Sequence, residues 1–81
     1  MMLAVKLIRY TRHARNRMRL HRISENEVES AVRQPAYSEP SGDDRINAWA
    51  TAGESFVRVT YKEEEAMFLV ISAVRKKKGW R

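Results

Sequence analysis

The chain has 81 residues, of which sixteen are Lys or Arg and ten are Asp or Glu, so its formal net charge is +6. This length suits one domain and is too short for two. The sequence contains no cysteine, which excludes disulfides, thiolate metal sites and cysteine nucleophiles.

The positive charge is concentrated at the two ends of the chain. Residues 1–22 include seven Lys or Arg, residues 66–81 include five, and all ten acids lie between Glu25 and Glu65. If the fold brings the two ends together, their cations form one face that attracts phosphates. We therefore expect a polyanion-binding protein with RNA as the first candidate ligand. The alternative is that the charge only keeps the protein soluble.

The apolar run at the N-terminus does not have the form of a secretory signal. Residues 1–8 are interrupted by Lys6, are followed by arginines and lack a small-residue cleavage site. No stretch approaches the roughly 20 apolar residues that a membrane span needs. We expect a soluble, cytoplasmic protein without a membrane partner, and an edge strand at residues 6–10.

A first helix is predicted from an N-cap at Thr11 to about Arg22. A projection at about 100° per residue places four arginines on the outer side of this helix. Arg17 is the only arginine on the inner side, where an unpaired charge is costly, so we expect it to meet a carboxylate, a carbonyl or an anionic ligand. The outward residues are Arg12, Arg15, Arg19 and Arg22, and the inward ones are His13, Ala14, Arg17, Met18, Leu20 and His21.

A second helix is predicted to start at a capping box formed by Ser24 and Glu27 and to stop before Pro35. The connection between the two helices is very short, as in helix-turn-helix proteins that bind DNA. That function is disfavoured, because Glu25, Glu27 and Glu29 on the second helix would repel phosphates.

A loop and three strands are predicted in the second half of the chain. The loop is residues 36–44, and the strands are residues 45–52, 55–62 and 66–74, with turns at 53–54 and 63–65. The last strand is apolar on both sides, as a central strand is. The predicted fold class is α+β, with two N-terminal helices packed on a three- to four-stranded antiparallel sheet. We expect a single domain over residues 1–81, in which residues 76–81 form a basic tail.

Five short motifs, in this order and spacing, resemble those of a small prokaryotic family known only as domain of unknown function 4258. They are Thr-Arg-His-Ala at residues 11–14, Arg-Met at 17–18, Ile-Ser-Glu at 23–25, Val-Arg-Val-Thr at 57–60 and Leu-Val-Ile-Ser at 69–72. The resemblance covers residues 8–75. The family's helix and strand positions correspond here to His13, Arg17, Arg58 and Ser72.

That family is similar in layout to the RelE and BrnT toxins, which are small basic ribonucleases whose helices precede a curved antiparallel sheet. The resemblance implies a RelE-like or barnase-like fold. It implies the toxin activity less directly, because a fold does not determine chemistry.

Metal-independent cleavage of RNA by 2′-hydroxyl attack needs a base, cations that stabilise the phosphorane, and an acid for the leaving 5′-oxygen. His13 is the candidate base or acid, and Arg17 and Arg58 are the candidate phosphate clamps, so these three are the predicted catalytic residues. Tyr61 or a C-terminal lysine is a candidate second proton-transfer group. We expect no cofactor and no metal, because His13 and His21 are two turns apart and cannot share an ion. The alternative for His13 is a structural role.

The C-terminal tail is predicted to contact nucleic acid. Trp80 stands among five cations, a pattern suited to stacking a base while lysines hold the backbone; the alternative is a solvated tail. The sheet face with Arg58 and Thr60 is the candidate site, against the alternative of an ordinary solvated face, and Trp49 is expected in the core. The predicted nucleic-acid-binding residues are Arg9, Arg12, Arg75, Lys76, Lys77, Lys78, Trp80 and Arg81.

Three functions are consistent with these features. The first is a RelE-like endoribonuclease, a toxin neutralised by an acidic antitoxin-like partner. The second is a noncatalytic module that binds RNA or nucleoprotein. The third is a partner-binding or homodimer-forming domain, since a core this small often needs a partner, in which Arg17 pairs with Glu27 or Glu29.

Overall fold

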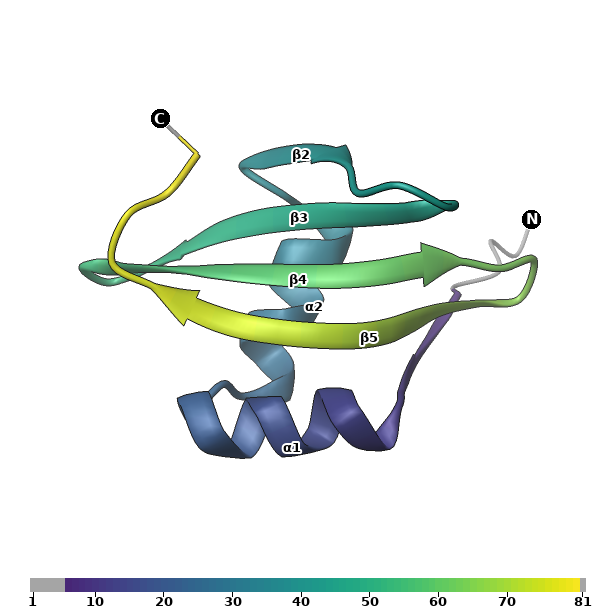
Figure 1. Ribbon diagram of the computed structural model, residues 1–81, viewed down its shortest axis with the longest axis horizontal. Helices are drawn as coiled ribbons and strands as arrows, with labels where there is room; N and C mark the ends of the chain where they lie inside the picture. Colours follow the sequence, from purple (N-terminus) through teal and green to yellow (C-terminus); the bar gives the residue numbers. More distant parts are fainter. Residues whose placement is uncertain (1–5, 81) are drawn as a thin grey trace, which may run out of the picture.

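The computed structural model describes residues 6–80, which form five strands and two helices. Figure 1 shows α2 behind the sheet and α1 running beside β5. The strands lie in one sheet in the order β1-β5-β4-β3-β2. In chain order the elements are β1 (Leu7–Tyr10), α1 (Arg12–His21), α2 (Glu25–Arg33), β2 (Tyr37–Pro40), β3 (Arg45–Ala52), β4 (Ser55–Glu63) and β5 (Met67–Lys76).

The fold class is α+β as predicted, but the sheet has five strands rather than three or four, and it is mixed rather than antiparallel. The edge strand predicted at residues 6–10 is confirmed as β1, so the helices follow a first strand. β1 runs parallel to β5, with Leu7 opposite Met67 and Tyr10 opposite Val70, whereas every other pair is antiparallel. The partners in β1 and β5 lie far apart in the chain, so no local signal could reveal that they run parallel.

The fifth strand, β2, lies in the segment predicted to be a loop. Tyr37 pairs with Trp49 and Pro40 with Ile46, so this segment forms one edge of the sheet. An edge strand tolerates proline, because one side of the strand makes no ladder hydrogen bonds. The Pro, Ser and Gly residues that indicated a loop therefore did not exclude a short strand.

The helix ends agree with the prediction. Thr11 Oγ1 accepts a hydrogen bond from the Ala14 N–H at 3.0 Å, which caps α1. Arg22 ends that helix in the left-handed region, with φ 54°. Ser24 and Glu27 form both hydrogen bonds of the capping box, and α2 ends at Arg33, before the proline. These termini follow from local hydrogen bonding alone.

The core lies between the helices and one face of the sheet. Ala14 and Met18 of α1 and Val28 of α2 are buried against Val57 and Val59 of β4. Because side chains alternate along a strand, Phe56, Arg58 and Thr60 lie on the opposite face, which we call the open face. Cross-strand pairing places Trp49 and Val74 beside Arg58, and Ser72 beside Thr60, on this same face.

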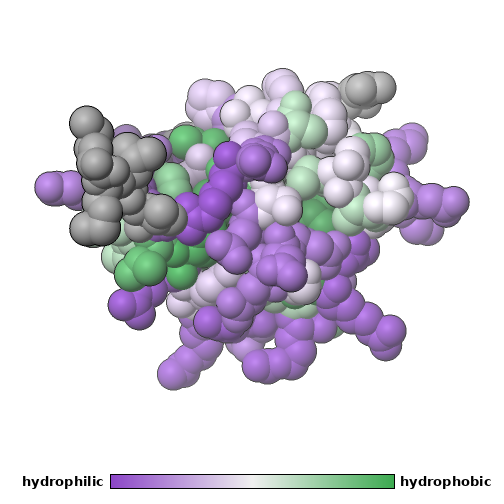
Figure 2. All heavy atoms as spheres, turned by 180° about the vertical axis from the view of Figure 1, so that it is seen from behind, coloured by the Kyte–Doolittle hydropathy of each residue, from purple (hydrophilic) through white to green (hydrophobic). Residues whose placement is uncertain are grey.

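The outward face of α1 is arginine-rich, as predicted. Arg12, Arg15, Arg19 and Arg22 are all exposed. Seen from behind, hydrophilic side chains dominate the lower part of the molecule, where α1 lies (Figure 2). Neither of the two described helices is long and apolar enough to cross a membrane.

Candidate functional site

An open groove of about 910 Å³ lies between α1, the open face and the C-terminal tail. We call it the basic groove. None of its lining residues is acidic, and its volume falls within the ~300–1,000 Å³ usual for ligand sites. It is lined by Arg17, His21, Trp49, Arg58, Ser72, Val74, Arg75, Lys76, Lys77, Lys78 and Gly79.

Residues from three parts of the chain meet in the basic groove because α1 packs beside β5. Arg17 and His21 are one helical turn apart, so both point from α1 to the same side. Arg58 lies opposite Val74 in the β4–β5 ladder, which puts its side chain on the adjoining open face. Two of the three predicted catalytic residues, Arg17 and Arg58, therefore line one groove.

Two buried hydrogen-bond donors of the groove residues lack an acceptor among residues 6–80. They are Nε of Arg58 and Nε1 of Trp49. The Arg58 guanidinium carbon lies 5.8 Å from the centroid of the Trp49 ring, so the two side chains contact each other. Thr60, on the same face, donates a hydrogen bond to Asn47 Oδ1 at 2.6 Å. The two residues form the kind of cross-strand pair that is expected on an ordinary solvated sheet face.

Arg17 forms no hydrogen bond or ion pair with any described residue, and its side chain is half-buried. The predicted pairing with Glu27 or Glu29 is wrong, because Glu27 binds Arg75 and Glu29 binds Arg33. Of the partners expected for an inward arginine, an anionic ligand is the one that the described part of the chain leaves open.

His21, and not His13, belongs to the basic groove. His13 is exposed and does not line the groove, so the predicted convergence of His13 with Arg17 and Arg58 is not found. The backbone N–H of Arg75 donates to Nδ1 of His21 at 3.4 Å, so the neutral ring carries its proton on Nε2. His21 therefore offers the groove an N–H donor. Its one-turn spacing from Arg17 was the signal that could have identified it.

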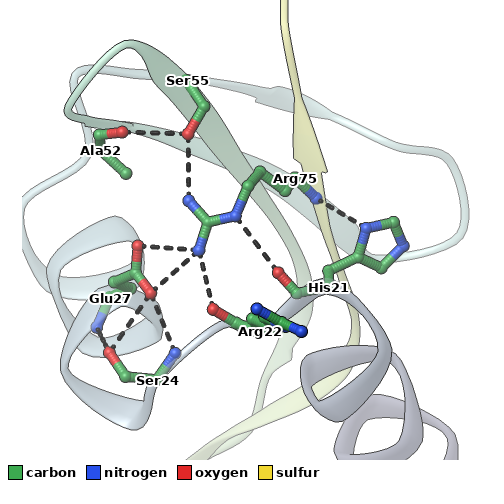
Figure 3. Close-up of polar contacts among 7 residues, drawn as sticks. All are labelled: His21, Arg22, Ser24, Glu27, Ala52, Ser55 and Arg75. Carbon is green, nitrogen blue, oxygen red and sulfur yellow. Dashed lines mark hydrogen bonds and ion pairs between the residues drawn. The ribbon is translucent and has the colours of Figure 1, made fainter.

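A hydrogen-bond network around Arg75 holds this corner of the groove (Figure 3). Arg75 Nε donates to the His21 carbonyl at 3.2 Å, and Nη2 donates to the Arg22 carbonyl at 2.9 Å. Nη1 donates to Ser55 Oγ at 3.0 Å, and Nη2 also contacts the Glu27 carboxylate at 3.2 Å. The Arg75 guanidinium thus ties the turn between the helices to β4 and β5, and its predicted contact with nucleic acid stays a prediction.

Glu27 completes this network from the start of α2. Its carboxylate accepts hydrogen bonds from the Ser24 backbone N–H at 3.0 Å and from Arg75. Burial raises the pKa of Glu27, but the hydrogen bonds from Ser24 and Arg75 and the charge of Arg75 outweigh it, so the pKa lies below the ordinary value of 4.5. Glu27 is therefore held as a carboxylate.

Residues 10–75 match the family described as Domain of unknown function (DUF4258). The chain belongs to this family. A search of curated proteins and a search of solved structures returned no match. The comparisons thus establish the DUF4258 family and give no support to the layout of the RelE and BrnT toxins.

The tail of this DUF4258 chain lies on the open face. The Trp80 ring stacks on Tyr37 with centroids 5.7 Å apart, and it meets Trp49 and Phe56 edge-on at 6.1 and 5.6 Å. The alternative of a solvated tail therefore does not apply to Trp80. Trp49 is buried as expected, with 6% of its surface exposed, but on the open face rather than in the helix-side core.

The remaining predicted residues lie outside the basic groove, except for Lys76, Lys77 and Lys78, which are exposed along it. Arg9 pairs with Leu69 near the start of β5, whereas the groove lies beside the end of that strand, and Arg12 is exposed on α1. Arg81 lies outside the described residues.

Tyr61, a candidate proton-transfer group, lies on the side of the sheet away from the basic groove. It is 7% exposed and packs edge-on against Phe68 in the helix-side core. Burial, and to a smaller extent the nearby Glu63 charge, raise the pKa of Tyr61. Its hydroxyl cannot reach a ligand on the open face.

Proposed function

We propose that this DUF4258 domain binds RNA by holding the phosphodiester backbone in the basic groove. The observation that carries the proposal is the set of unpartnered donors there. Arg58 Nε is buried without an acceptor among the described residues, and Arg17 has no counterion among them. An unsatisfied buried donor costs about 1–3 kcal/mol, which a ligand rich in acceptors would offset. Phosphate oxygens are such acceptors, and they also complement the charge of the groove.

A single strand suits the groove better than a DNA duplex does. A helix-turn-helix protein inserts its second helix into the major groove, but α2 begins with Glu25 and Glu27 and continues with Glu29. The basic groove instead combines cations with the Trp49 ring, which is the combination that binds unpaired strands. His21 adds an N–H donor that a 2′-hydroxyl oxygen can accept, and this contact would favour RNA over DNA.

A binding assay with a labelled single-stranded RNA in EDTA tests this proposal. Arg58→Gln should weaken binding about tenfold, the loss expected for one charged hydrogen-bonding contact. Arg19→Gln removes the same charge from the outward face of α1 and should leave the affinity nearly unchanged, because Arg19 is exposed and does not line the groove. Equal losses in the two variants would show that only net charge matters and would contradict a defined site. A DNA strand of the same sequence measures the contribution of the 2′-hydroxyl.

A metal-independent endoribonuclease is the second candidate, favoured by the presence of His21, Arg17 and Arg58 in one groove. In that reaction the 2′-oxygen attacks phosphorus, the bond to the 5′-oxygen breaks, and a 2′,3′-cyclic phosphate forms. The two arginines would stabilise the phosphorane, the His21 Nε2–H would donate a hydrogen bond to the leaving 5′-oxygen, and water would supply the proton that this oxygen takes up. A neutral lysine among residues 76–78 would have to remove the 2′-hydroxyl proton, since His21 Nδ1 is taken by Arg75. Because cleavage needs this additional neutral lysine and binding does not, we propose RNA binding as the first candidate function.

Gel analysis of the same EDTA reactions tests for cleavage. If the second candidate is correct, wild-type protein yields 2′,3′-cyclic phosphate ends, His21→Ala loses at least about tenfold in rate, and His13→Ala keeps the wild-type rate. His13 is the matched control because it lies on the same helix, is exposed and does not line the groove. Intact RNA in every lane would leave binding as the function.

A further inference from the structure

Trp80 occupies an aromatic seat formed by side chains of three adjacent strands. Tyr37 of β2, Trp49 of β3 and Phe56 of β4 all face it from the open face. Figure 1 shows the tail turning back at the end of β5 and crossing the ends of β4 and β3 toward β2. The seat is therefore built by the sheet, whereas its occupant comes from the tail.

The seat is shaped for a flat aromatic group. The Trp80 and Tyr37 rings are nearly parallel, with an interplanar angle of 10°, while Trp49 and Phe56 meet the indole at 62° and 81°. A slot with one stacking wall and two edge-on walls fits any planar ring of similar size. A nucleobase meets this requirement, because every base has an aromatic face and stacking tolerates all four.

One polar feature of the seat is not satisfied by Trp80. Trp49 Nε1 is a buried donor without an acceptor among residues 6–80, although the two indoles are in contact. An indole ring carries a donor and no acceptor, so Trp80 cannot accept this hydrogen bond. The carbonyl oxygens and ring nitrogens of a nucleobase are acceptors. A base therefore provides what the present occupant lacks.

The seat is continuous with the basic groove. Trp49 and Gly79 line the groove, and both adjoin the seat: Trp49 is one of its walls, and Gly79 precedes Trp80. A Cβ atom on Gly79 would lie 2.8 Å from Phe56 Cε1, so the tail backbone passes directly over this ring. A strand whose phosphates lie along Lys76–Lys78 and Arg58 would bring an unpaired base to the position of Trp80.

We propose that the aromatic seat of Tyr37, Trp49 and Phe56 is a nucleobase-binding site, filled by the Trp80 indole until an unpaired base of single-stranded RNA displaces it. This inference rests on the proposed function and names its substrate class as unpaired RNA. Trp80 then acts as an internal competitor, so its removal tightens RNA binding. If Trp80 itself stacked the base, its removal would instead weaken RNA binding.

Two probes separate the seat from the groove: a single-stranded RNA oligonucleotide, and inorganic polyphosphate of the same charge, which has no bases. Trp80→Ala should raise the affinity for RNA several-fold and leave the affinity for polyphosphate unchanged. Adding Tyr37→Ala to that variant should lower the affinity for RNA about tenfold, the usual loss of one stacking platform, again without effect on polyphosphate. Leu20→Ala is the control, since this residue is 68% exposed on α1 and does not line the groove.

A fluorescence measurement reports the displacement directly. Trp49→Phe keeps a ring in this wall of the seat and leaves Trp80 as the one tryptophan of the sequence, so emission then comes from Trp80 alone. RNA is added to saturation, because this variant lacks the Trp49 Nε1 donor and should bind more weakly. Addition of RNA should shift this emission toward the red as the indole enters water, and polyphosphate should not.

Different results would contradict the base-binding seat and phosphate binding in the basic groove. Weaker or unchanged RNA binding by Trp80→Ala, with polyphosphate still bound, overturns the base-binding seat and leaves phosphate binding in place. Quenching of Trp80 without a red shift also overturns it, because Trp80 would then be the platform. Binding of neither probe overturns both proposals. A melting temperature within a few degrees of wild type confirms that each variant is folded. Trp80→Phe keeps an aromatic ring in the seat, so this variant should bind RNA as weakly as wild type does.

Discussion

Arg17 and Arg75 are both arginines of the same groove, yet their surroundings differ completely. Arg75 binds two carbonyls, a hydroxyl and a carboxylate of its own chain. Arg17 binds none of the described residues. A side chain that is satisfied within the fold contributes to stability, whereas one that is unpaired and half-buried is available to a ligand.

This contrast predicts opposite phenotypes for two charge-neutral substitutions. Arg17→Gln should weaken RNA binding about tenfold with little change in the melting temperature, because no hydrogen bond or ion pair among the described residues is lost. Arg75→Gln should lower the free energy of unfolding by about 2–4 kcal/mol, since it leaves Glu27 and two carbonyls without their donor. Thermal unfolding and RNA titration of both variants check this. A large stability loss in Arg17→Gln would instead support a structural role for Arg17.

The lowered pKa of Glu27 links folding stability to pH. Because the folded pKa lies below the ordinary value of 4.5, the stabilising contribution is complete above that pH and is lost as the pH falls through the folded pKa. Glu27→Gln should cost about 1–2 kcal/mol at neutral pH, a figure reduced by the partial exposure of the pair. The difference in unfolding free energy between wild type and variant should shrink below about pH 4.5. A difference that stays constant down to pH 3 would contradict this account.

At the scale of elements, the contact between α1 and β5 decides whether the groove exists. Thr11 serves both elements: its Oγ1 accepts from the Ala14 N–H and donates to the Ile71 carbonyl of β5 at 3.2 Å. The same residue donates its backbone N–H to the Val70 carbonyl at 3.0 Å. The N-cap thus also attaches the helix that carries Arg17 and His21 to the sheet.

Removal of this side chain should therefore cost more than loss of a cap alone. Thr11→Ala should lower the free energy of unfolding by about 1–3 kcal/mol, because a cap and a hydrogen bond to β5 are both lost. Thr51→Ala is the matched control, since Thr51 is exposed on β3 and should change stability by less than about 0.5 kcal/mol. Denaturant unfolding curves measure both values. Equal effects would mean that the Thr11 contacts add nothing to stability.

At the scale of the whole molecule, positive charge is gathered on two surfaces. One is the basic groove, and the other is the outward face of α1, where Arg12, Arg19 and Arg22 are exposed. Arg15, on the same outer side, is partly neutralised by Glu25 at 2.9 Å and lies over the Tyr10 ring. Among residues 6–80, the groove is the surface that combines cations with unpartnered buried donors, which supports the proposal that it holds the ligand.

The salt dependence of RNA binding distinguishes these surfaces. The groove cations outside the Arg75 network are Arg17, Arg58, Lys76, Lys77 and Lys78. If they alone contact phosphates, the logarithm of the binding constant should fall with the logarithm of salt concentration with a slope of about −3.5 or shallower. An Arg12→Gln/Arg19→Gln variant should keep this slope. A slope steeper than about −5 that this variant reduces would show that the outward face of α1 also binds the strand.

The sequence by itself determined the features that depend on near neighbours. Thr11, Ser24 and Glu27 specify their helix ends through hydrogen bonds within one turn, and the β3–β4 hairpin follows from alternation around Gly53. The outward arginines of α1 also follow from residue spacing, whereas His13 and Leu20, which were predicted to face inward, are exposed. Each of these signals depends on residues close together in the chain, so it can be recognised without knowing the fold.

The tertiary structure decided which distant residues meet. The parallel pairing of β1 with β5 places α1 beside the end of β5, and this packing brings His21 rather than His13 to the groove. The tertiary structure also places the Arg75 guanidinium in an intramolecular hydrogen-bond network and stacks the Trp80 ring on the open face. Such contacts join segments that are far apart in the chain, and their geometry depends on how the helices and strands pack together. Positive charge at both ends could therefore be predicted from the sequence, but not the groove in which part of it is gathered.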